Sequence, residues 1–81
     1  MTKQEKLLAS LVMAKTFKWS KVETLFAQLG YEQKQMTGSR VRFYNKDTND
    51  LVNLHTPHPE NEVKGGALKS IKDHLRSEGY L

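Results

Sequence analysis

The chain has 81 residues, of which 13 are Lys or Arg and 9 are Asp or Glu, so its formal net charge at pH 7 is +4. This length allows one domain with a small core, and a sequence without cysteine excludes disulfides and thiolate metal sites. The sequence has no apolar run of the roughly 20 residues that a membrane span needs, and no apolar signal-peptide segment near its N-terminus. We therefore expect a single cytoplasmic domain over residues 1–81, whose basic charge favours anionic partners such as nucleic acid.

Two helices are predicted in the N-terminal part of the chain. The segment Thr2–Glu5 matches a capping box, and the helical spacing of the apolar residues after it predicts a helix over residues 3–15. A second capping box, Ser20–Glu23, precedes an apolar stripe that stops before Gly30, a residue type that often ends helices in the left-handed conformation. Trp19, just before this helix, is expected to anchor the core.

The spacing of apolar residues then changes from that of helices to that of strands. We predict strands over residues 31–36, 40–44 and 51–55, joined by a tight turn at residues 37–39 and a polar loop at residues 45–50. The second strand alternates cleanly, with Val41 and Phe43 on one face and polar side chains on the other.

The apolar pattern also predicts how the last two strands pair. Placing Val41 opposite Leu54 gathers the apolar side chains of both strands on one face, whereas a slip of one residue mixes the two faces. On the opposite face this register gives two polar pairs, Arg40 with His55 and Arg42 with Asn53.

A last helix is predicted after residues 56–63, which contain both prolines and form a stiff connection. Gly65 and Gly66 open this helix, and Gly79 ends it, with Tyr80 available to pack back. Its apolar stripe consists of Ala67, Leu68, Ile71 and Leu75. The order α-α-β-β-β-α predicts an α+β fold in which helices cover one face of a three-stranded antiparallel sheet.

Arg40, Arg42 and Tyr44 project from the open face of the predicted sheet. Two arginines two residues apart suit adjacent phosphates, and the tyrosine ring suits base stacking. The alternative is an ordinary solvated strand face.

His55 and His58 are the candidate catalytic residues. Imidazole has an unperturbed pKa of about 6.5, which suits proton transfer near neutral pH. In RNA cleavage one group takes the proton of the 2′-hydroxyl, another protonates the leaving 5′-oxygen, and a cation such as Arg40 stabilises the phosphorane. Alternatively, His58 is a turn residue held between two prolines. Only carboxylates lie near these histidines, so we predict no metal site, and His74 is expected to lie at the surface.

Basic residues also gather on the last helix. Lys64 and the two glycines after it present free backbone N–H groups to an anion, although the spacing is not that of a P-loop, so neither nucleotide hydrolysis nor a cofactor is indicated. Lys69, Lys72 and Arg76 form a basic stripe, for which a solvated helix face is the alternative to phosphate contact.

The run from about residue 17 to residue 79 resembles the HicA family of toxins from toxin–antitoxin systems. In that family a helix leads to Gly-Ser at a hairpin turn, then to a short strand pair, a proline-rich segment and a helix that opens with Lys-Gly. The matching segments here are Gly38-Ser39, Val41–Phe43, Pro57–Pro59 and Lys64–Ile71. The resemblance makes residues 17–79 the family-like core and residues 1–16 an additional N-terminal helix.

The resemblance implies a fold like that of a double-stranded-RNA-binding domain, metal-independent cleavage of mRNA, and neutralisation by a HicB-type antitoxin. The family's usual catalytic histidine directly follows Gly-Ser, and here that position is Arg40. We hypothesise that His55 is the catalytic acid or base, with Arg40 on the scissile phosphate and His58 assisting. The expected RNA-binding residues are Ser39, Arg40, Arg42, Tyr44, Lys64, Lys69 and Lys72.

Two other functions remain compatible with the sequence. A non-catalytic RNA-binding module would have the same fold, with Arg40 marking lost chemistry. A protein-interaction domain would instead present its basic face to an acidic partner.

Overall fold

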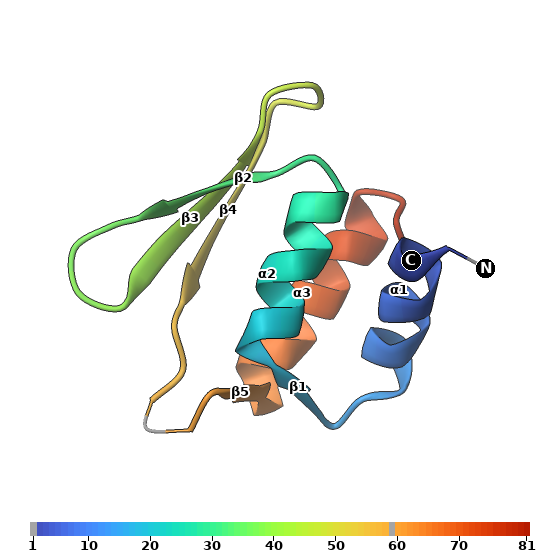
Figure 1. The fold of residues 1–81 in the computed structure, drawn as a ribbon, viewed down its shortest axis with the longest axis horizontal. Helices are drawn as coiled ribbons and strands as arrows, with labels where there is room; N and C mark the ends of the chain where they lie inside the picture. Colours follow the sequence, from blue (N-terminus) through green and yellow to red (C-terminus); the bar gives the residue numbers. More distant parts are fainter. Residues whose placement is uncertain (1, 59) are drawn as a thin grey trace.

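The computed structural model describes residues 2–58 and 60–81, which form three helices and two small antiparallel sheets (Figure 1). In chain order the elements are α1 Lys3–Met13, β1 Thr16–Lys18, α2 Trp19–Gln28, β2 Glu32–Gln35, β3 Arg40–Asn45, β4 Asp50–His55, β5 Glu62–Lys64 and α3 Gly65–Ser77. Pro59, in the predicted stiff connection, lies outside the described residues. No helix of the described part is long and apolar enough to cross a membrane.

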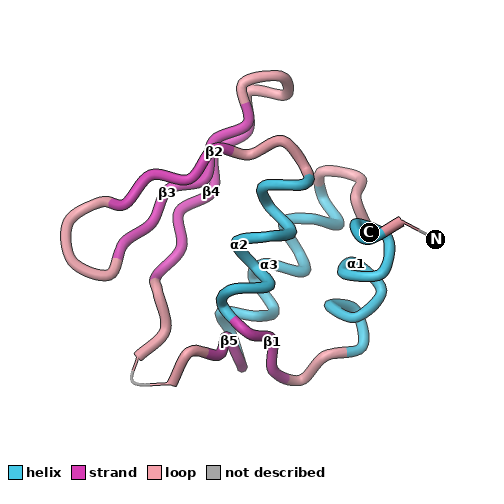
Figure 2. Tube along the Cα trace, in the orientation of Figure 1, coloured by secondary structure: helices cyan, strands magenta, loops and turns pink. Residues whose placement is uncertain are grey.

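The elements form three layers. Figures 1 and 2 show α2 and α3 side by side, with the sheet β2-β3-β4 on one side of them and α1 on the other. The core lies between these layers and consists of Leu11, Phe17, Trp19, Val22, Leu25, Phe26, Leu29, Tyr31, Val41, Phe43, Val52, Val63, Leu68, Ile71 and Leu75. The predicted α+β fold is confirmed, and so is the core position of Trp19.

The three-stranded sheet has the predicted order and register. Strand β3 lies in the middle and pairs antiparallel with β2 and β4. Val41 lies opposite Leu54, and Arg40 opposite His55, as the apolar pattern predicts. Val41 and Phe43 are buried, and the Phe43 ring packs against Trp19 and Phe26 of α2. The polar residues that alternate with them on β3 are exposed or half-buried on the open face.

A second sheet, β1 paired with β5, is not in the prediction. Each strand has only three residues. Phe17 pairs with Val63, Thr16 with Lys64 and Lys18 with Glu62. Strands this short carry too little alternation to be recognised, and their pairing is set by tertiary contacts. The predicted stiff connection over residues 56–63 therefore ends in a strand.

The same pairing explains why the second capping box is wrong. Helix α2 begins at Trp19, after Lys18, and has no side-chain cap, so Ser20 lies inside the first turn. The backbone N–H of Trp19 donates to the carbonyl of Asn61 at 3.0 Å, which satisfies one of the free donors at the helix start. The predicted N-cap at Thr2 is confirmed, because its Oγ1 accepts from the backbone N–H of Glu5 at 3.1 Å.

Smaller differences concern the outer helices. Helix α1 ends at Met13 rather than at residue 15, and Ala67 in the predicted apolar stripe of α3 is exposed. At the other end of α3, Gly79 has the predicted left-handed conformation, with φ +85°, and Tyr80 packs against the core.

Asn45 is a buried polar residue, 2% exposed, and holds the end of β3 against α2. Its Nδ2 donates to the carbonyl of Leu29 at 3.1 Å, and its Oδ1 accepts from the backbone N–H of Asp47 at 3.0 Å. Asn45→Ala removes all these bonds and leaves buried backbone groups without partners, so we expect the free energy of unfolding to fall by about 1–3 kcal/mol. Urea denaturation measures this change, and the matched variant of an exposed asparagine, Asn53→Ala, should stay within about 0.5 kcal/mol of wild type.

Candidate functional site

The open face of the sheet brings together the first group of predicted site residues. The pairing of β3 with β4 sets Arg40 opposite His55, and both residues are exposed. Arg42 lies opposite Asn53, whose Oδ1 accepts from the Arg42 Nε at 3.5 Å. Tyr44 is also exposed on this face, and its hydroxyl donates to Oδ1 of Asn49 at 2.8 Å. Arg40 is therefore exposed opposite His55, and the half-buried Arg42 lies two residues farther along β3.

Ser39 fixes the position of His55 from the turn between β2 and β3. Its Oγ lies 3.4 Å from Nδ1 of His55, and its carbonyl accepts from the backbone N–H of Thr56 at 2.7 Å. The turn can bend this tightly because Gly38 has a φ of +69°, a conformation that favours glycine. Nε2, the other ring nitrogen of His55, forms no hydrogen bond with another described group.

A pocket of about 280 Å³ beyond the end of β4 joins His55 to the second group of predicted residues. Its lining includes His55, His58 and Lys64, the residue that precedes α3. The Lys64 Nζ lies 3.4 Å from Oε2 of Glu60, and both side chains are largely exposed, so this ion pair is readily exchanged for another anion. The residues that line this hollow thus include two histidines, a lysine and one carboxylate residue, Glu62.

His55 also lines a second, smaller pocket. It has a volume of about 190 Å³, and apolar side chains of the core, Trp19, Val63 and Ile71, form part of its wall. Asn53 and Ser70 add polar groups. A pocket with apolar walls and a few hydrogen-bonding groups suits a flat heterocycle.

The other basic residues of α3 lie away from this site. Lys69 and Lys72 line a separate pocket of about 430 Å³ between α3 and the segment that follows α1. Lys69 pairs with Asp73 at 2.8 Å. The half-buried Lys72 donates from Nζ to the carbonyl of Ala14 at 2.7 Å, at the end of α1. Its ammonium therefore satisfies a backbone carbonyl that α1 leaves without a helical partner.

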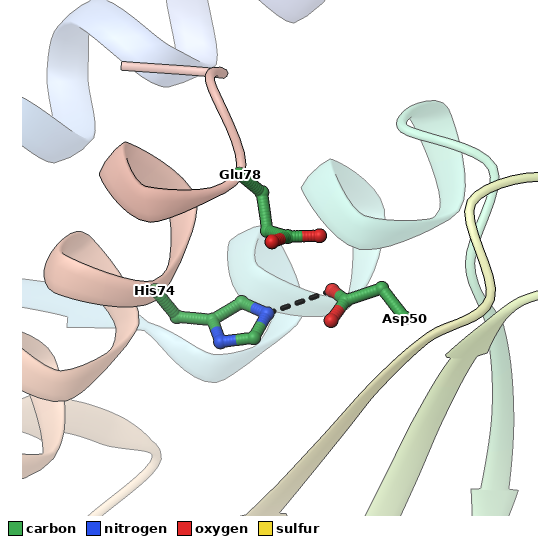
Figure 3. Close-up of side chains that lie close together, drawn as sticks. All are labelled: Asp50, His74 and Glu78. Atoms are coloured by element: carbon green, nitrogen blue, oxygen red, sulfur yellow. Dashed lines mark hydrogen bonds and ion pairs between the residues drawn. The ribbon is translucent and has the colours of Figure 1, made fainter.

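A group of polar residues that the sequence analysis missed lies at the opposite end of β4. His74, predicted at the surface, has a side chain only 28% exposed, and its Nε2 lies 2.7 Å from Oδ2 of Asp50 (Figure 3). The hydroxyl of Tyr31 donates to the same oxygen. A faint signal is the position of His74 beside the apolar stripe of α3, but nothing in the sequence pairs it with Asp50.

This hydrogen-bonded group shifts two pKa values. Partial burial alone raises the pKa of Asp50, but the hydrogen bonds from Tyr31 and His74 and the attraction to His74 outweigh it and lower the pKa below its usual value. Burial, and then the hydrogen bond and charge of Asp50, raise the pKa of Tyr31 above its usual value. Because the pKa of Asp50 is lower in the folded state, the group stabilises the fold above the ordinary pKa of aspartate, and this contribution is lost as the pH falls through the lowered value.

Comparison with known proteins identifies the family. No curated protein and no solved structure shows a significant match to the chain. A family model described as the HicA toxin of bacterial toxin–antitoxin systems matches residues 19–77, from the start of α2 to the end of α3. The match includes the whole three-stranded sheet, both pockets at His55 and most of the core. The chain therefore belongs to the HicA toxin family.

Proposed function

We propose that this chain is an endoribonuclease toxin that cleaves mRNA, with His55 as its central catalytic residue. The observation that carries the proposal is the pocket that His55, His58 and Lys64 line together. Arg40, opposite His55 in the sheet, adds a second cation to the same region. Two titratable imidazoles beside two cations are the groups that phosphodiester cleavage requires.

The proposed reaction is an internal transfer at phosphorus. His55 takes the proton of the 2′-hydroxyl through Nε2, and the freed oxygen attacks the adjacent phosphorus. The bond to the 5′-oxygen then breaks as His58 protonates that oxygen, giving a 2′,3′-cyclic phosphate and a 5′-hydroxyl end. Arg40 and Lys64 stabilise the negative charge that develops on the phosphoryl oxygens. No metal is needed for these steps.

The surface around His55 offers contacts to the rest of a single strand. The 190 Å³ pocket beside His55 suits one base, next to the scissile phosphate. Arg42 and Tyr44 continue along β3, where they suit a further phosphate and a stacked base. Ser39 orients His55. Lys69, on the α1 side of α3, suits a more distant part of the RNA, whereas Lys72 already binds the end of α1.

Arg40 is the reason to consider a second candidate function, in which the chain binds RNA without cleaving it. In the resemblance to HicA toxins, the position after Gly-Ser is the usual place of the catalytic histidine, and Arg40 stands there. The pairing of Arg40 with His55 supports an exchange of roles across the hairpin, since the imidazole is presented beside the same position. If His55 does not replace the lost group, the chain is a non-catalytic RNA-binding module.

Family membership supports a protein partner as well, and we propose a HicB-type antitoxin that covers the open face of the sheet. Tyr44 and Leu51 are exposed apolar side chains on this face, and with Arg42 they line a pocket of about 610 Å³. By occupying this pocket, a partner with acidic and apolar side chains would keep RNA away from His55. Both the mRNA and this partner place the proposed activity in the cytoplasm.

Induced expression in a bacterial host tests the proposal. We expect growth arrest with loss of intact mRNA, and relief of both when a HicB-type antitoxin that binds this chain is co-expressed. Purified protein should cut RNA in the presence of EDTA and leave 2′,3′-cyclic phosphate ends. A folded protein that binds RNA without cutting it would establish the binding module instead, and one without RNA affinity at physiological salt would leave only protein interaction.

A further inference from the structure

The residues around His74 have the arrangement of a small cation site. One donor atom each from Asp50, His74 and Glu78 lie within 4.8 Å of one another (Figure 3). Asp50 is the first residue of β4, whereas His74 lies in the last turn of α3 and Glu78 follows as its C-cap. A spacing of four residues puts His74 and Glu78 on one side of the helix, toward β4. Three donors from two layers of the fold thus converge on one point.

The charges in this place favour a cation. Within residues 2–58 and 60–81, no lysine or arginine nitrogen lies within 4 Å of a carboxylate oxygen of Asp50 or Glu78. The end of α3 adds the partial negative charge of its free carbonyl groups, so a glutamate at the C-cap is placed against the helix dipole. Two carboxylates at a helix C-terminus, with only one imidazole between them, form a local excess of negative charge. A bound cation would remove it.

The donors and their surroundings indicate which cation. One imidazole nitrogen with two carboxylate oxygens suits Zn²⁺ and similar divalent transition metals, whereas Ca²⁺ and Mg²⁺ prefer oxygen donors alone. The Asp50 side chain is 12% exposed and that of His74 28%, so two of the three donors are already shielded from bulk water. The Tyr31 hydroxyl donates to the Asp50 carboxylate and orients it, as outer residues commonly do around metal ligands.

We propose that Asp50, His74 and Glu78 bind one divalent transition-metal ion of the Zn²⁺ type, which ties the start of β4 to the end of α3. The ion takes the place of the hydrogen bond between His74 and Asp50, and water completes the coordination. His55 is at the other end of β4, so this site is separate from the proposed RNA chemistry. The metal acts on the stability of the fold, and its binding is independent of RNA cleavage.

Zinc binding to the full-length, tag-free protein tests the proposal without RNA. In isothermal titration with ZnCl₂ we expect saturation at one equivalent, together with a rise in the thermal unfolding temperature that EDTA reverses. Glu78→Gln removes one ligand at an exposed position that forms no hydrogen bond with another described side chain, so this variant should fold normally. It should bind zinc about tenfold or more weakly, and His74→Gln should lose saturable binding.

Two matched variants separate this site from unspecific binding. His58→Gln and Glu32→Gln replace an exposed histidine and an exposed glutamate elsewhere, and both should bind zinc as the wild type does. Failure to saturate in wild type, equal affinity in Glu78→Gln and wild type, or loss of binding in His58→Gln would each overturn the proposal. None of these results bears on whether the chain cleaves RNA.

Discussion

Replacing His55 with glutamine is expected to reduce the rate of RNA cleavage by at least about 100-fold while RNA affinity stays nearly unchanged. Glutamine retains a side chain that can bond to Ser39, at the position where Oγ now lies 3.4 Å from the imidazole, but it cannot accept and release a proton near neutral pH. The measurement is single-turnover cleavage of an RNA oligonucleotide, with affinity determined separately by fluorescence anisotropy. The two readouts together separate a loss of chemistry from a loss of binding.

The controls for this experiment use the other histidines and Arg40. His74→Gln removes an imidazole at the opposite end of β4 and should retain cleavage at temperatures where the variant is folded. His58→Gln removes the proposed proton donor to the 5′-oxygen and should also lower the rate, although less than His55→Gln does. Arg40→Gln should weaken RNA binding and reduce the salt dependence of the affinity, because a phosphate contact is lost. Full cleavage by His55→Gln would show that the chemistry takes place elsewhere.

The part of the site that follows from strand pairing could be predicted from the sequence. Two apolar residues on each of two strands favour this register over a slip of one residue, because such a slip moves the apolar residues of the shifted strand to the opposite face. The same register then brings Arg40 opposite His55, although the two are 15 positions apart. Side chains on one face of a regular hairpin are therefore accessible to sequence reasoning.

The contacts between layers could not be predicted in this way. Helical spacing predicts that Lys72 is one member of a basic stripe, but its ammonium donates to the carbonyl of Ala14, 58 residues earlier. The sequence predicts that His74 lies at the surface, but its imidazole contacts the Asp50 carboxylate, which belongs to another layer of the fold. Neither partner is on the same element, and helical or strand periodicity says only which face a residue occupies. What that face meets is decided by how the helices pack on the sheet.

The starts of the helices likewise differ in whether local sequence or a tertiary contact sets them. Thr2 caps α1 through a contact three residues away, which the sequence contains in full. Ser20 has the same pattern, but the start of α2 is set by the pairing of β1 with β5 and by the bond from Trp19 to Asn61. A local capping signal is therefore outweighed where a tertiary contact already satisfies the helix N-terminus.

Helix α1 lies outside the segment that matches the family, so its contribution to the fold can be tested by itself. Leu11 is fully buried, with 0% exposure, and belongs to the same core as the residues of α2 and α3, whereas its neighbour Val12 is 46% exposed. Leu11→Ala should reduce the free energy of unfolding by about 2–5 kcal/mol, which is large for an 81-residue domain. Val12→Ala, the matched control on the same turn, should change it by less than about 0.5 kcal/mol.

Urea denaturation followed by tryptophan fluorescence measures both variants, because Trp19 lies in the core at 5% exposure. A loss of stability confined to Leu11→Ala would mean that α1 completes the core of this family member. The Lys72 ammonium, which donates to the carbonyl of Ala14 just after α1, would then hold an essential layer in place. Equal stability of the two variants would instead make α1 an appendage, free to serve another surface. The small size of the domain favours the first result, since a chain this short has few other apolar residues with which to enclose α2 and α3.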